Sequence, residues 1–76
     1  MATSILIIEK DEPRLRLMEW GLREDGFEVL TAHGLPESDA ALRPDVIVLN
    51  SSVPEAGKRV LISALRYLVP DARIID

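Results

Sequence analysis

The chain has 76 residues, no cysteine and a net charge of −4, so it predicts one small domain without disulfides or thiolate metal sites. Its negative charge argues against a direct nucleic-acid or anionic-membrane surface, because phosphates are met by clustered lysine and arginine. No apolar run could span a bilayer and no signal-peptide pattern opens the chain, so we expect a soluble, cytoplasmic protein.

The first half of the chain predicts a strand, a helix and a second strand. Residues 4–8 form a continuous apolar run, as in a strand covered on both faces. A helix is expected to begin at residues 11–13, where proline suits the first turn and acidic groups suit the helix dipole. Residues 25–26 end it, since Gly26 can take a positive φ. Residues 27–32 form the second strand.

The second half alternates helix and strand again. Residues 36–42 predict a helix of about two turns. Residues 45–49 form the most apolar strand, and residues 55–69 give the clearest helix. Residues 72–75 form a fourth strand. The order βαβαβαβ predicts a single α/β domain over residues 1–76.

Helical spacing predicts which side of each helix is buried. Trp20 either packs at the edge of the first helix's apolar stripe, which we expect, or marks a contact surface. That stripe contains Leu15, Leu17, Met18, Gly21 and Leu22, and the stripe of the last helix contains Val60, Leu61, Ala64, Leu65 and Leu68.

Right-handed crossovers predict a parallel sheet in the strand order 2-1-3-4. Ligands of such sheets bind beyond the carboxyl ends of the strands, between the first and the third. Glu9, Lys10 and Asp11 follow the first strand, and Asn50 follows the third. We therefore expect these four residues to lie close together.

The chain resembles the receiver domain of bacterial response regulators, which has a flavodoxin-like fold. The matching segments are ILIIEKDE at 5–12, GFEV at 26–29, PDVIVLN at 44–50, Gly57 and PDARII at 70–75. The resemblance implies two acidic residues after the first strand that hold Mg²⁺. It also implies an aspartate after the third strand that is phosphorylated by a histidine kinase.

Two positions depart from the family pattern. Glu9 and Lys10 fall at the acidic pair, and Asn50 falls at the phosphoacceptor. An amide has no anionic oxygen to attack phosphorus, and a protonated lysine is not a metal ligand. We therefore expect no catalytic residue, no metal site, and magnesium binding that is weak or absent. Lys10 either pairs with Glu9 or Asp11 in place of the metal or extends into water.

Ser51 and Ser52 have no predicted base nearby, so a hydrolase triad is not expected. His33, the only histidine, is expected in an exposed loop away from the pocket. The chain also ends before the last strand and helices of the family, so we expect a truncated receiver fold with one sheet face partly uncovered. Val46, Val48, Ile74 and Ile75 are expected at this open face and at the edge of the fourth strand.

The sequence thus predicts a degenerate receiver domain that is not an enzyme. It would act through phosphorylation-independent protein contact, as a homodimer or with another signalling protein. The alternative is a phosphoacceptor domain that is inactivated by Asn50 or cut short. A small enzyme using Glu9, Asp11 and Lys10 is a third possibility.

Overall fold

The computed structural model describes residues 2–34, 43–49 and 54–75. The helix predicted over residues 36–42, as well as Asn50, Ser51 and Ser52, lies outside the described residues. The described elements follow the chain in the order β1 (Ser4–Ile8), α1 (Glu12–Glu24), β2 (Glu28–Ala32), β3 (Val46–Leu49), α2 (Glu55–Leu68) and β4 (Arg73–Ile75).

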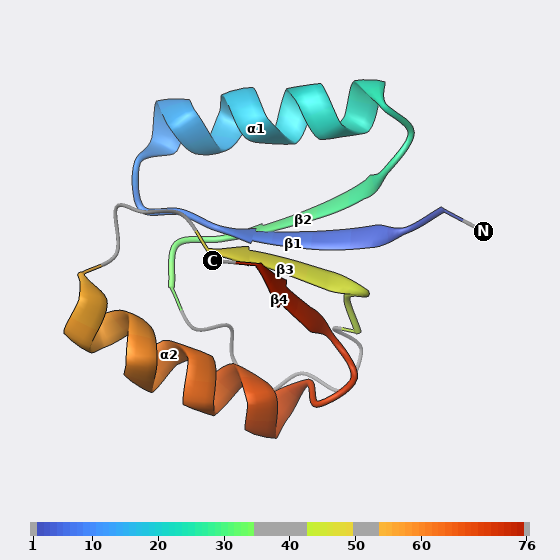
Figure 1. The fold of residues 1–76 in the computed structure, drawn as a ribbon. Helices are drawn as coiled ribbons and strands as arrows, with labels where there is room; N and C mark the ends of the chain where they lie inside the picture. Colours follow the sequence, from blue (N-terminus) through green and yellow to red (C-terminus); the bar gives the residue numbers. More distant parts are fainter. Residues whose placement is uncertain (1, 35–42, 50–53, 76) are drawn as a thin grey trace.

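The four strands form one parallel sheet in the order β2-β1-β3-β4, which confirms the predicted topology. The central strand β1 pairs with β2 and β3, and in this register Ile8 lies between Ala32 and Leu49. Helix α1 covers one face of the sheet and α2 the other (Figure 1). This opposite placement agrees with the crossover directions predicted from the sequence.

The two faces of the sheet carry two separate apolar clusters, because successive strand residues point to opposite faces. Every residue from Ile5 to Ile8 is buried, as expected for a central strand with a helix on each side. On the α1 side the buried residues are Ile5, Ile7, Leu15 and Val29; on the α2 side they are Leu6, Ile8, Ile47, Leu49 and Leu65.

Both ends of α1 follow local sequence chemistry. Asp11 is the N-cap, and its side chain accepts a hydrogen bond of 3.1 Å from the backbone N–H of Arg14. Pro13 occupies the first turn, where its missing N–H costs no helical hydrogen bond. Gly26 follows the helix with φ of 93°, a conformation that glycine adopts without steric cost. These ends were predicted correctly.

The buried side of α2 differs from the prediction. Val60, which was expected in the core, is 71% exposed. The buried residues of the helix are Lys58 and Leu65, and the partly buried Leu61 and Ile62 pack beside Leu65. The buried side of α2 is therefore rotated about the helix axis relative to the prediction. It includes Lys58, which the sequence pattern placed on the polar surface.

The buried side of α1 is narrower than predicted. Leu15 is buried, and Met18 and Leu22 pack around the same cluster. However, Leu17 is 69% exposed and Trp20 is 65% exposed, so the expected edge packing of Trp20 is wrong. Two large apolar side chains therefore project from the outer side of this helix.

The sheet face above β3 and β4 is covered only in part by the described residues. We call Val46, Val48 and Ile75 the open face; the two valines are partly buried and Ile75 is 47% exposed. All three lie on the α1 side of the sheet, since Val48 is paired with Ile75. Ile74 lies on the other side and packs against the α2 cluster, which corrects its predicted place at the open face.

Candidate functional site

The carboxyl ends of β1, β2 and β3 form one edge of the sheet. The backbone N–H of Glu9 donates to the carbonyl of Ala32 over 3.0 Å, which ties the residue after β1 to the end of β2. Leu49 ends β3 directly beside Ile8. The carboxyl ends of β1, β2 and β3 therefore lie at the same edge of the sheet, and this is the edge at which a ligand is expected to bind.

Glu9 is fully buried at this edge. Its Oε1 accepts a hydrogen bond of 3.1 Å from the backbone N–H of Asp11. Hydrogen bonds to a carboxylate are stronger than those to neutral acceptors, so this contact stabilises the bend between β1 and α1. The carboxylate of Glu9 thus has a structural contact of its own within the loop.

The neighbouring residues Lys10 and Asp11 are both exposed. The carboxylate of Asp11 caps α1, as described above. No ion pair joins Lys10 to Glu9 or Asp11 among the residues that the structure describes, so the predicted pairing of Lys10 is not seen there. Its side chain instead lines a hollow between the carboxyl edge and α2.

This hollow has a volume of about 400 Å³. Its walls are mostly apolar, and Lys10 and His33 are its two basic residues. The lining residues are Ile8, Lys10, His33, Gly34, Pro54, Gly57, Val60, Leu61 and Ala64.

His33 is exposed, as predicted, but it does not lie away from the carboxyl edge. Its Nε2 lies 2.5 Å from Oε2 of Glu12, in the first turn of α1. The hydrogen bond from His33 lowers the pKa of Glu12, and the charges of His33 and Arg16 act in the same direction. The register of Ile8 with Ala32 could have placed His33 here, because His33 follows Ala32 directly.

Lys58 is a charged residue that sequence reasoning missed. Its side chain is 7% exposed, and its Nζ lies 3.6 Å from Oε1 of Glu55, whose side chain is 85% exposed. It belongs to the amino-terminal half of α2, next to Gly57 in the wall of the hollow. A buried lysine is uncommon, and no polarity pattern in the sequence distinguishes it from a surface lysine.

Within residues 2–34, 43–49 and 54–75, no group of three or more His, Cys, Asp or Glu side chains is placed to hold a metal ion. Neither described helix has the length and apolar character needed to cross a lipid bilayer. The expected weakness of magnesium binding stays a prediction.

The parallel sheet order and the acidic loop after β1 define a receiver-like α/β domain. The chain is 36% identical over 73 residues, 92% of its length, to the transcriptional regulatory protein PrrA of Mycobacterium bovis. The same values hold for the transcriptional regulatory protein PrrA of Mycobacterium tuberculosis. The chain thus carries a response-regulator receiver-type domain, as its sequence predicted.

The chain spans 31% of the length of these two relatives. No family model matches the chain, and no solved structure matches it.

Proposed function

We propose that this receiver-type domain contributes to two-component signalling through protein contact, without accepting a phosphoryl group itself and without catalysis. The observation that carries the proposal is the pair of residues at the family's reactive positions: Asn50 at the phosphoacceptor and Lys10 in the acidic pair. A carboxylate attacks phosphorus through an anionic oxygen. The neutral amide of asparagine offers none.

The geometry of the carboxyl edge supports the proposal that magnesium binds only weakly there. Magnesium prefers several oxygen ligands in octahedral geometry. At this edge the Oε1 of Glu9 accepts from the N–H of Asp11, and the carboxylate of Asp11 accepts from the N–H of Arg14. Lys10, which stands between them in the sequence, adds an exposed positive charge that repels a divalent cation.

Phosphoryl transfer from acetyl phosphate tests this function. The wild-type chain, Asn50→Asp and Lys10→Asp/Asn50→Asp are incubated with acetyl phosphate and Mg²⁺, and intact mass is measured. We expect no phosphoryl mass gain in the wild type and a gain in the double variant. Lys10→Asp alone is the matched control, because it restores the acidic pair without an acceptor.

The outcome also separates the alternative function. A gain in Asn50→Asp alone would identify a conventional phosphoacceptor domain that one substitution has inactivated. Phosphorylation of the wild type at the carboxyl edge would contradict the proposed function directly.

The open face is the proposed contact surface. Val46, Val48 and Ile75 present apolar area beside β4, and β4 is one of the two outer strands of the described sheet. Exposed apolar area next to an edge strand favours association. We assign the open face to contact with a second copy of this chain. Two-fold pairing of β4 with β4 of the second copy extends the sheet with the same residues on each side. Another signalling protein is the alternative partner.

Light scattering after size exclusion, at micromolar concentration, tests this surface. Ile75→Glu should lower the assembly mass, because it places a charge in the contact. Thr31→Glu is the control, as it adds the same charge at an exposed strand position on β2. Circular dichroism checks that both variants remain folded. An unchanged mass for Ile75→Glu would contradict the assignment of a second copy to the open face.

A further inference from the structure

The outer face of α1 carries apolar side chains that the fold does not use. Leu17 and Trp20 are 69% and 65% exposed, on the side of the helix opposite Leu15 and Leu22. Tryptophan is the residue most enriched at the centres of protein interfaces, because one side chain buries a large area at a small entropic cost. This exposed pair is therefore a candidate contact surface, separate from the open face.

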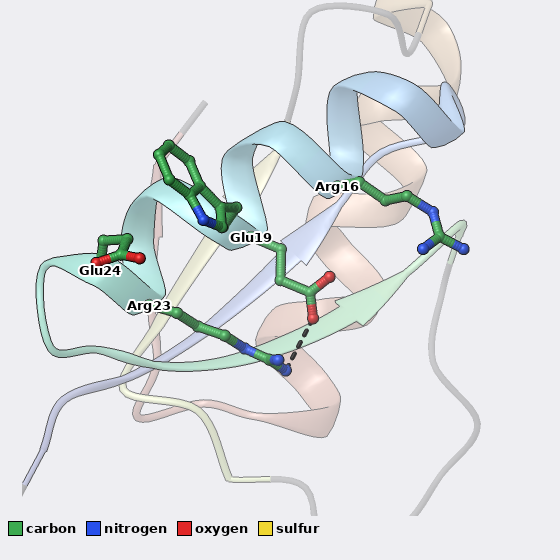
Figure 2. Close-up of a pocket in the computed structure, with 5 residues that line it drawn as sticks. Arg16, Glu19, Arg23 and Glu24 are labelled. Atoms are coloured by element: carbon green, nitrogen blue, oxygen red, sulfur yellow. Dashed lines mark ion pairs between the residues drawn. The ribbon is translucent and has the colours of Figure 1, made fainter.

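The surface around Trp20 is hollowed and charged. A hollow of about 390 Å³ is lined by Arg16, Glu19, Trp20, Arg23 and Glu24. Figure 2 shows Arg16 and Glu24 at opposite ends of this set, with Glu19 and Arg23 between them. Glu19 and Arg23 are joined by an ion pair of 2.8 Å, so they satisfy each other within one chain.

The charges at the two ends are arranged symmetrically about Trp20. Arg16 lies four residues before it and Glu24 four residues after it, so all three share one side of the helix. If two copies of α1 cross so that the inclined rows formed by Arg16, Trp20 and Glu24 run antiparallel, with Trp20 at the two-fold axis, Arg16 of each copy lies beside Glu24 of the other.

We propose that this outer face of α1 binds the same face of a second copy of the chain in an antiparallel pair. We choose a second copy as the partner because the charges of this face are self-complementary. A two-fold contact must place each patch against itself, and this patch matches itself in only one direction. A parallel pair would place Arg16 against Arg16 and Glu24 against Glu24. The antiparallel pair makes two oppositely charged contacts around two indoles.

The contact of Arg16 within its own chain does not oppose this pairing. Arg16 Nε lies 3.3 Å from Glu12 Oε1, and both side chains are well exposed. Exposed ion pairs contribute little to stability, so Arg16 can turn toward another carboxylate at small cost.

Trp20 is the only tryptophan, so its fluorescence reports this contact alone. The test uses the Ile75→Glu chain, in which the proposed open-face contact is blocked. With rising concentration we expect the Trp20 emission to shift to the blue and quenching by acrylamide to fall, while sedimentation shows a dimer. Trp20→Ala should weaken this dimer by about tenfold or more.

Charge reversal tests the direction of pairing. Arg16→Glu and Glu24→Arg should each weaken self-association, because each places like charges together twice. An equal mixture of the two should restore it, since the mixed pair makes two opposite-charge contacts. Arg66→Glu, an exposed position on α2 with the same change in net charge as Arg16→Glu, is the control and should have no effect.

Three results would overturn the inference. These are Trp20 emission that does not respond to concentration, charge variants that associate like the wild type, and a mixture no stronger than its components. The test is independent of the phosphorylation proposal and of the open face. If Ile75→Glu leaves the assembly mass unchanged while Trp20→Ala lowers it, the open face fails and the α1 contact stands.

Discussion

Replacement of Leu65 by alanine should remove a large part of the stability of this domain. Leu65 is completely buried on α2, where it packs with Leu6, Ile8, Ile47 and Leu49. A Leu→Ala change in such a site costs about 3–5 kcal/mol, from lost apolar transfer and from the cavity left behind. A domain of this size has a total unfolding free energy of about 4–11 kcal/mol. The variant should therefore lose between about a quarter and all of that free energy.

Urea unfolding followed by circular dichroism measures this effect. Small domains lose about 1 kcal/mol of stability per molar urea, so the midpoint should fall by about 3 M or more. Val60→Ala is the matched control on the same helix. Val60 is 71% exposed, and its replacement should change stability by no more than about 0.5 kcal/mol.

This pair of variants also tests the orientation of α2. If the sequence-predicted face were right, Val60→Ala would be costly. Equal losses for the two variants, or a loss below about 1 kcal/mol for Leu65→Ala, would refute the reasoning from burial.

Three further predictions concern α1 and its neighbours. Gly26→Ala should cost about 1 kcal/mol in thermal or urea unfolding because φ is 93°, whereas Gly57→Ala, inside α2 with nothing near its new Cβ, should be neutral or stabilising. Asp11→Ala should cost about 1 kcal/mol through loss of the N-cap, and Asp11→Asn should retain most of it. The pKa of Glu12 is lowered in the folded state, so its stabilising effect is present above its unfolded pKa and is lost as pH falls through the folded pKa. His33→Ala should raise that pKa in an NMR titration of the Glu12 carboxyl carbon; an unchanged pKa would contradict the role of the hydrogen bond.

Features set by local chemistry could be predicted from the sequence. The cap at Asp11 and the turn at Gly26 depend on neighbouring backbone groups, so one short segment specifies each. The strand order could be predicted because crossover handedness leaves few topologies for alternating strands and helices.

Features set by tertiary packing could not be predicted. Any polarity pattern places Lys58 on the surface. In the structure Lys58 is buried, and the core side of α2 is turned away from Val60. Whether Leu17 and Trp20 are buried depends on how much of α1 is covered by β1 and β2, the strands beneath it. Because strand residues alternate, Ile74 and Ile75 face opposite sides of the sheet. Which of the two faces α1 depends on the register of β4 with β3, which the sequence did not specify.

Our central proposal is that this receiver-type domain does not accept a phosphoryl group at its carboxyl edge. The most direct measurement is an amide NMR spectrum recorded while beryllofluoride and Mg²⁺ are added together. We predict no saturable shift of the amide signals of Glu9, Lys10 or Asn50. Saturable shifts of these amides at micromolar or low millimolar concentration would show a competent acceptor site and would contradict it.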